Sequence, residues 1–355
     1  MLESLYEKAL KKRKEINNAF TKDLELIKIN PNDLWMDYQS KTRTSDFTIS
    51  GGDGSFNQKR FISSILYAVD AECLVYDGHT LNKIESSEVN IIPPYKYVRD
   101  ILRNYMSIME IKNSYHAYKK YNVDLSLFDG SILGNIIRPF PVENELPSTI
   151  KEKINKIYRP RLEKILKNEK EVGLASSQFS SEIEEEFDDY KIESMIYLEN
   201  LENLLALGMF LKETRNIAAI SKTSIRTDYF NINIPDIAIF ENYCKKEGYS
   251  QLFYQDVNTT VKRDFPILNK FFRDLKFTVF YCRLEDHKNV LKIELPFQAS
   301  EKQIIEILEK IKVVNAEGYP YLLKKAHNDV VIKVKDMEKL KKILNLIERT
   351  GRDML

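Results

Sequence analysis

The chain has 355 residues, of which 43% are hydrophobic and 30% are charged, and this excludes a disordered chain, a collagen and a small disulfide scaffold. Its 54 basic residues balance 53 acidic ones, for a net charge of +1. A uniformly basic nucleic-acid coat is therefore excluded, whereas a local basic channel is not.

The cysteines and the apolar runs indicate the compartment. Cys73, Cys244 and Cys282 are widely spaced and form no CxxC pair, so we expect neither a zinc ribbon nor a disulfide framework. The first twenty residues contain no apolar core, and the longest apolar run, 204–211, is too short to cross a bilayer. We expect a cytoplasmic protein with reduced cysteines and no membrane association.

Residues 1–44 are predicted to be an N-terminal helical segment, with an amphipathic helix over 3–28. Its stripe, which includes Leu5, Leu10 and Ile16, is a candidate docking surface for a partner, and packing within the chain or in a dimer is the alternative. Short β-like runs follow at 47–50, 60–69 and 72–77. GGDGS follows the first run and Asp77-Gly78 follows the last, so we predict an antiparallel meander.

Next comes a predicted helix over 95–120. It has an apolar stripe of Val98, Ile101, Leu102, Tyr105 and Met109. Residues 123–131 then predict a short buried strand that ends in a turn.

Residues 147–212 are predicted to be helical. The segment 151–170 has a net charge of +5 from eight basic and three acidic residues, 182–189 holds six acidic residues, and 201–211 is predicted to be a buried helix. A solvated helix face explains both charged segments, and the alternative for 151–170 is a path for phosphates.

Strands are predicted again at 216–221, 275–284 and 289–297. In the last of these, Lys292 and Glu294 alternate with apolar residues, which predicts a half-buried strand. Ser300 and Gln303 predict a capping box that opens a helix.

The last part of the chain is predicted to hold a short helix and strand over 318–332 and a final helix over 336–355. Asp336 is predicted to cap the final helix, and Gly351 to end it. The whole order predicts an α/β fold, and its opening meander, helix and strand begin an RNase H-like mixed sheet flanked by helices, with a helical insertion at about 147–212.

Two Asp-Gly dipeptides are candidates for chemistry. No P-loop, GxGxxG, HExxH or GxSxG motif is present. Asp53 and Asp129 each begin a DGS sequence after an apolar strand, whereas Asp77-Gly78 is predicted to be a tight turn. On neighbouring strands the two carboxylates would repel unless a cation lay between them, and Mg²⁺ and Mn²⁺ prefer such ligands. Tight turns remain the alternative for both.

Three further residues are candidates near these aspartates. Glu110 lies at the border of the apolar stripe on the 95–120 helix, where a solvated glutamate is the alternative. Tyr319 and His327 are eight residues apart across a helix opened by Pro320, so both can lie on one face. A core aromatic and a structural imidazole are the alternatives for this pair.

The ordered set SGGDGSF, SIMEIKNSY, LSLFDGSIL and GYPYLLKKAHNDVVI resembles the NurA nuclease family of archaea and some bacteria. The resemblance covers about residues 45–335 and implies an RNase H-like nuclease domain there. It also implies a homodimer that cleaves DNA with Mn²⁺ or Mg²⁺, as a 5′–3′ exonuclease with single-strand endonuclease activity. The implied partner is a hexameric HerA-type ATPase in DNA end resection.

By position, Asp53, Glu110 and Asp129 match the family's metal-binding acids, and Tyr319 and His327 match its C-terminal active-site pair. The resemblance also places a lysine near the DNA at the position of Lys222, in AISKTS.

The implied chemistry is two-metal hydrolysis of phosphodiesters. Asp53 would bridge the ions, Glu110 and Asp129 would complete their shells, His327 would be a ligand or an acid/base, and Tyr319 would donate a hydrogen bond to the scissile phosphate.

Two other functions stay open. A non-catalytic DNA-end clamp or loading factor for a translocase would share the fold, although the presence of all the acids argues against it. An RNA-cleaving or Argonaute-like RNase H-like enzyme is the second, and 355 residues show no additional guide-binding domain.

Overall fold

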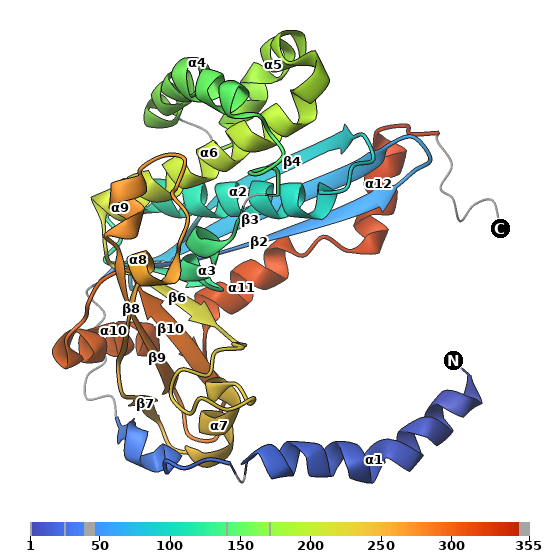
Figure 1. The fold of residues 1–355 in the computed structure, drawn as a ribbon. Coiled ribbons are helices and arrows are strands. Elements are labelled where there is room, and N and C mark those ends of the chain that lie inside the picture. Colours follow the sequence, from blue (N-terminus) through green and yellow to red (C-terminus); the bar gives the residue numbers. More distant parts are fainter. Residues whose placement is uncertain (1, 25, 39–46, 140, 170–171, 348–355) are drawn as a thin grey trace.

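The computed structural model of the chain describes residues 2–24, 26–38, 47–139, 141–169 and 172–347. Its centre is a ten-stranded mixed sheet with the order β1-β7-β9-β10-β6-β5-β2-β3-β4, in which β8 also pairs with β9 (Figure 1). The strands of this sheet are β1 (Trp35–Asp37), β2 (Ile49–Arg60), β3 (Ile65–Tyr76), β4 (Leu81–Ile92), β5 (Leu125–Asp129), β6 (Ile217–Ser221), β7 (Gly248–Ser250), β8 (Phe253–Asp256), β9 (Lys276–Arg283) and β10 (Val290–Leu295). A small separate pair consists of β11 (Asn315–Ala316) and β12 (Tyr319–Pro320).

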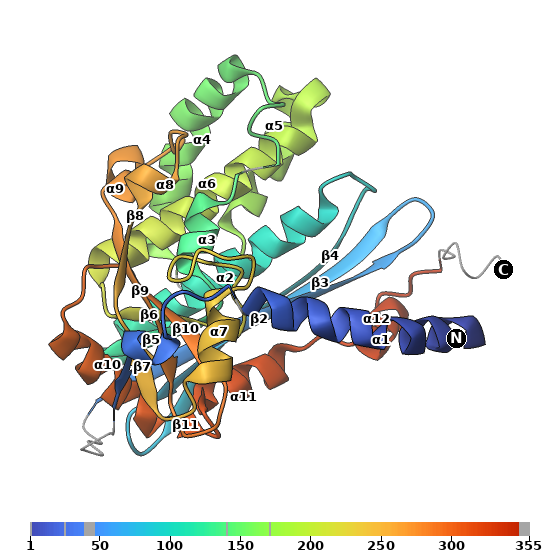
Figure 2. The ribbon, with the colours of Figure 1, turned by 60° about the horizontal axis from the view of Figure 1, so that its bottom comes forward.

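Helices flank the sheet on both sides (Figure 2). The longer helices are α1 (Glu3–Leu24), α2 (Val98–Tyr121), α4 (Ser148–Asn168), α6 (Lys191–Glu213), α10 (Glu301–Val313), α11 (Tyr321–Val330) and α12 (Val334–Ile343). The shorter ones are η1 (Pro31–Leu34), α3 (Ile132–Ile137), η2 (Ala175–Phe179), α5 (Ser180–Glu186), η3 (Asp188–Tyr190), α7 (Asp236–Tyr243), α8 (Val257–Thr260) and α9 (Asn269–Arg273).

An antiparallel meander is present as β2, β3 and β4, but its strands differ from the predicted ones and β4 was not predicted. GGDGS lies inside β2 and is not a turn, and the runs 60–69 and 72–77 are not two strands because β3 includes 65–69 of the first and 72–76 of the second. The reason is long-range pairing, since β2 and β3 are antiparallel partners along twelve residues. The predicted tight turn at Asp77-Gly78 is confirmed, with Gly78 at φ 93°.

The central strands β5, β6 and β9 are buried on both faces of the sheet, since their neighbouring residues enter different cores. Phe128, Ala219 and Val279 pack in the core that holds α2 and α6. Leu127, Ala218 and Phe280 pack in the core that holds α10 and α11. This alternation, with helices on both faces, is the layered arrangement expected of an α/β domain.

The helical insertion is confirmed as α4, α5 and α6 with short 3₁₀ turns between them, and 201–211 is a buried part of α6 as predicted. Two basic residues of the 151–170 segment pair with the acidic segment. Arg161 donates to Glu182 at 2.6 Å, and Lys153 pairs with Glu186. These pairs favour the interpretation of 151–170 as a solvated, ion-paired surface, and they argue against a path for phosphates.

Strand β10 corrects a second expectation. Lys292 and Glu294 were predicted to face solvent, yet they are 5% and 1% exposed. Their charges compensate each other, because Lys292 Nζ donates to Glu294 Oε1 at 2.6 Å. The alternation of charged and apolar residues predicted a solvent-exposed face, whereas the structure has a buried ion pair there.

The C-terminal elements follow the prediction in part. The capping box at Ser300 and Gln303 is present. Residues 318–332 form β12 and then α11, so a helix followed by a strand was wrong. Asp336 is the third residue of α12 and accepts from the backbone of the N-cap, Lys333, so it is not itself the cap. Gly351 lies outside the described residues.

The predicted N-terminal helix is α1, which extends away from the sheet (Figure 1). Leu5, Leu10 and Ile16 are 54–71% exposed, so their stripe does not pack within the chain. The three cysteines are free and buried. Among the described residues, no helix is both long and apolar enough to cross a membrane.

Candidate active site

Asp53 lies in the middle of β2, where three glycines let helices approach the strand closely. A Cβ on Gly51 would lie 2.8 Å from Leu322 Cβ of α11, on one face of the sheet. On the other face, a Cβ on Gly54 would lie 2.6 Å from Glu110 Oε1 of α2. The glycines therefore serve close packing of α2 and α11 and not a turn, and Asp53 is held between the two helices.

Asp129 ends β5, the parallel neighbour of β2, and Gly52 pairs with Phe128 just before the two aspartates. Gly130 follows at φ 106°, a conformation that favours glycine, and Ser131 caps α3 by accepting from Gly134 N. The predicted placement of Asp53 and Asp129 on neighbouring strands is confirmed.

Glu294 of β10 holds the turn after Asp129. Its carboxylate accepts from Ser131 Oγ at 2.8 Å and from Leu133 N at 3.1 Å. This positioning residue was not predicted, because a charged residue that alternates with apolar ones in a strand is expected to face solvent. The only sequence signal was that Lys292 and Glu294 share one face of the strand.

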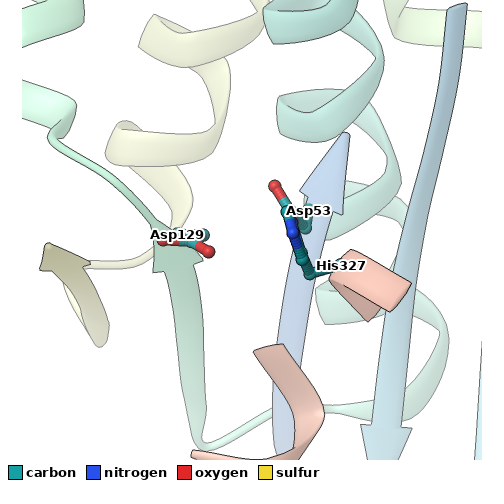
Figure 3. Close-up of side chains that lie close together, drawn as sticks. All are labelled: Asp53, Asp129 and His327. Atoms are coloured by element: carbon teal, nitrogen blue, oxygen red, sulfur yellow. The ribbon is translucent and has the colours of Figure 1, made fainter. Parts of the chain in front are cut away.

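Asp53, Asp129 and His327 form a compact trio. Each offers a ligand atom, and these atoms all lie within 4.8 Å of one another. His327 comes from α11, and its Nδ1 lies 2.7 Å from Asp53 Oδ2 (Figure 3). Asp53 is 8% exposed, Asp129 is partly buried and His327 is exposed, so the trio is open to solvent on the α11 side.

The acids of this region are electrostatically strained. Burial and the charge of Asp129 raise the pKa of Asp53, while hydrogen bonds from His327 and from Gly54 N oppose the rise. Glu72 lies directly opposite Asp53 on β3, and burial and the charge of Asp329 raise its pKa to about 7. A cation at the trio would relieve the repulsion between the Asp53 and Asp129 carboxylates.

Glu110 lies outside the trio. It approaches β2 beside Gly54, on the face opposite α11. Burial raises its pKa well above the usual value, and the charges of Asp53 and Asp129 raise it further. The three acids are thus coupled, although Glu110 is not among the atoms within 4.8 Å of one another.

Lys222 and Tyr319 complete the surroundings of Asp129. Lys222 Nζ lies 2.8 Å from Asp129 Oδ2 and 4.6 Å from the centre of the Tyr319 ring. The Tyr319 hydroxyl is buried beside the Asp129 carboxylate. Burial, the charge of Asp129 and a hydrogen bond to that carboxylate raise its pKa, so the hydroxyl keeps its proton and can act as a donor.

The residues present fit a divalent metal ion. Two carboxylates are the ligands that Mg²⁺ and Mn²⁺ prefer, and one imidazole shifts the set toward Mn²⁺ and later metals. The fit is supported by the raised pKa of Asp53, because an ionised carboxylate there lacks enough positive charge. Lys222 pairs with Asp129, and His327 makes a hydrogen bond with Asp53.

A family model for the NurA domain matches residues 47–332, most of the chain. This chain belongs to the NurA domain family. The match includes every member of the trio, together with Glu110, Lys222 and Tyr319.

The NurA relatives cover nearly the whole chain. A probable DNA double-strand break repair nuclease NurA from Methanocaldococcus jannaschii is 29% identical, covering 98% of this chain and 89% of its own. The DNA double-strand break repair nuclease NurA of Saccharolobus solfataricus is 25% identical, covering 97% and 95%.

Solved NurA structures share the fold. The crystal structure of the NurA nuclease from Sulfolobus solfataricus has a TM-score of 0.74 and 22% identity, covering 97% of each chain. A crystal structure of NurA bound to dAMP and manganese has a TM-score of 0.69 and 18% identity, covering 100% of each. The large mixed sheet flanked by helices is therefore the NurA fold.

Proposed function

We propose that this chain is a metal-dependent DNA nuclease that hydrolyses phosphodiester bonds, with its catalytic unit at residues 45–335. The observation that carries this proposal is the trio of Asp53, Asp129 and His327, which offers three ligand atoms within 4.8 Å of one another. Membership of the NurA family and relatives named as DNA repair nucleases support it.

The proposed ligands of the metal are Asp53, Asp129 and His327, with Glu110 completing the site. Divalent ions, two in our proposal and Mn²⁺ before Mg²⁺, would supply Lewis acidity and neutralise charge on the reacting phosphate. Glu110 is coupled to both aspartates, so binding of a cation favours its ionised form.

Lys222 and Tyr319 are proposed to contact the DNA. Lys222 Nζ pairs with Asp129 at 2.8 Å and is partly exposed, so a metal ion at Asp129 would release the ammonium toward a phosphate. The buried Tyr319 hydroxyl is a protonated donor beside the same carboxylate, which suits a hydrogen bond to the scissile phosphate.

The finer proposals concern the biological role. We infer a 5′–3′ exonuclease with single-strand endonuclease activity, acting as a homodimer with a HerA-type hexameric ATPase in DNA end resection. The free, buried cysteines fit a reducing cytoplasm. A non-catalytic DNA-end clamp is disfavoured because such a protein needs no cluster of strained acids.

The experiment is cleavage of labelled single-stranded DNA, duplex DNA and RNA with Mn²⁺, Mg²⁺ or EDTA. We expect DNA to be cut with Mn²⁺ and left intact with EDTA, and labels at either end report the polarity. Binding of DNA without cleavage in every metal would support the clamp instead. Cleavage confined to RNA would identify a different RNase H-like enzyme.

A further inference from the structure

A polar cavity of about 340 Å³, separate from the trio, lies on the α2 side of the sheet. It is bounded by α2, α6 and the end of α3. The side chains that matter here are Arg103, Asn104, Ser107, Asn135, Arg138 and Asn203. Because most of these groups are hydrogen-bond donors, the cavity suits a ligand rich in acceptors.

Two guanidinium groups give the cavity a positive charge. Burial and the neighbouring charge of Arg103 lower the pKa of Arg138, so the two groups are close enough to repel each other. Arg103 Nη1 pairs with Asp100 Oδ1 at 3.1 Å. Arg138 makes no side-chain ion pair with any residue that the structure describes. With two guanidinium groups and one carboxylate, the cavity keeps a net positive charge, which a bound anion would neutralise.

Two buried polar groups in the wall lack partners. The Ser107 hydroxyl is buried with no hydrogen bond, and Ser107 is only 7% exposed. Asn104 Nδ2 is also buried and unpaired, while Asn104 Oδ1 accepts from Asn203 Nδ2 at 2.9 Å. Orphaned donors of this kind are costly and rare in native proteins, and they point to a ligand with acceptor oxygens.

The cavity is adjacent to Glu110 and Asp129 of the acidic site. Asn135 lines both this cavity and a smaller pocket that contains Glu110 and Asp129. On α2, Arg103, Ser107 and Glu110 recur at i, i+4 and i+7, which places them along one face. Seven residues rise about 10 Å, so Arg103 and Glu110 lie within the span of a short stretch of one DNA strand.

We propose, resting on the nuclease function proposed above, that this cavity binds a phosphate of the DNA strand that is cut at the acidic site. Arg103 and Arg138 would hold the phosphate oxygens with their planar forks, and Ser107 and Asn104 would donate the remaining hydrogen bonds. The phosphate belongs to the same strand as the scissile bond. It is either an internal phosphodiester or a terminal phosphomonoester, and it sets the register of the strand at the acids.

The test is DNA binding without cleavage. Fluorescence anisotropy of a labelled single-stranded oligonucleotide in EDTA compares the wild type with Arg103→Gln/Arg138→Gln. We expect at least a tenfold weaker affinity and a salt slope that is smaller by about 1 to 2. The matched control is Arg99→Gln, an exposed arginine on the same helix outside the cavity, which should bind within twofold of wild type. Unchanged affinity and slope in the double variant would overturn the proposal.

Two further variants guard against a folding defect. Arg138→Gln alone changes a residue that is exposed overall, although its guanidinium is partly desolvated, so it should keep the wild-type melting temperature and still lose about threefold in affinity. Arg103→Lys/Arg138→Lys keeps both charges but loses the planar forks, and it should bind between the wild type and the glutamine variant. A stable Arg138→Gln with wild-type affinity would contradict the proposal.

Modified oligonucleotides identify the phosphate. If the phosphate is terminal, removing the 5′- or 3′-phosphate should make the affinities of the wild type and the double variant equal. If it is internal, a neutral methylphosphonate should make the two affinities equal when it stands at one position of the oligonucleotide and at no other. An affinity difference that persists with every modified oligonucleotide overturns the proposal. A wild type that neither binds nor cuts DNA refutes the nuclease function itself, whereas a wild type that cuts and arginine variants that bind equally well refute only this cavity.

Discussion

Asp53 is an acidic side chain whose surroundings disfavour its ionised form. It is 8% exposed, its pKa is raised by burial and by Asp129, and its positive partner is a side chain that is charged only when protonated. Such a carboxylate costs stability in the absence of a cation. Function therefore explains its presence better than stability does.

The first prediction concerns this residue. Asp53→Ala should reduce Mn²⁺-dependent cleavage by more than about a hundredfold, because a ligand of the metal is lost. Its melting temperature in EDTA should equal or exceed that of the wild type, since a strained buried acid is removed. Cleavage assays and differential scanning fluorimetry measure the two effects.

Glu306→Ala, an exposed residue of α10, serves as the control for this variant. It should leave both cleavage and melting unchanged. Near-normal cleavage by Asp53→Ala would remove the metal site from consideration.

Glu199 of α6 is a buried acid away from the proposed metal site. It is 6% exposed and accepts from the Tyr105 hydroxyl at 2.6 Å, while its other oxygen has no partner among the described residues. Burial raises its pKa to about 8. The native carboxyl thus keeps its proton up to about pH 8, whereas the unfolded one loses it near pH 4.5.

The second prediction follows from this difference. Stability supplied by the protonated Glu199 is present below about pH 4.5 and is lost as the pH rises toward 8. Glu199→Gln should therefore match the wild type at pH 5 and exceed its free energy of unfolding by about 2–4 kcal/mol at pH 9. Urea unfolding at both pH values measures the difference. An equal change at both would show that ionisation of Glu199 is not the cause.

At the scale of elements, α2 connects three parts of the molecule. Its apolar stripe packs on the sheet, Glu110 reaches β2, and Lys112 reaches the helical insertion. Lys112 is 3% exposed, and its Nζ lies 2.7 Å from Glu202 Oε1 of α6 and 2.9 Å from Glu169 Oε2 after α4. One buried cation thus joins the insertion to the helix that carries Glu110.

The third prediction tests this connection. Lys112→Met should lower the free energy of unfolding by about 3–5 kcal/mol, because it leaves the fully buried Glu202 without a counter-charge. Urea titration followed by circular dichroism measures the loss. Lys120→Met, at the exposed end of the same helix, should cost less than about 1 kcal/mol. Equal effects of the two variants would show that the ion pair is unimportant.

At the scale of the whole molecule, α1 extends away from the sheet and exposes its apolar stripe (Figure 1). Leu5, Leu10 and Ile16 are more than half exposed along a helix of 22 residues. Exposed apolar residues on one element of this length mark an interaction surface. The homodimer proposed above gives this stripe an occupant, namely a second copy of the chain.

The fourth prediction is that α1 contributes to this dimer. The full chain should have the mass of a dimer in light scattering at micromolar concentration, and a chain that lacks residues 1–28 should have the mass of a monomer. A dimer that survives the truncation would assign α1 to another partner, and a monomeric full chain would contradict the homodimer itself.

Local chemistry made several features predictable from the sequence. The helical stripe of α2, the capping box at Ser300, the turn at Asp77-Gly78 and the DGS that ends β5 all depend on residues within a few positions of one another. The candidate residues Asp53, Asp129 and His327 were also found in this way, and the structure brings them together.

Long-range packing decided the rest. GGDG is part of a strand because it pairs with β3, and its glycines admit the close approach of α2 and α11. Lys292 and Glu294 pair with each other in the interior, and Glu294 also holds the turn at Ser131. The parallel register of β2 and β5 places Asp53 beside Asp129, and the fold gathers Arg103, Arg138 and Ser107 around one cavity. Sequence periodicity reports which face of an element is apolar, but only the tertiary structure determines what that face meets.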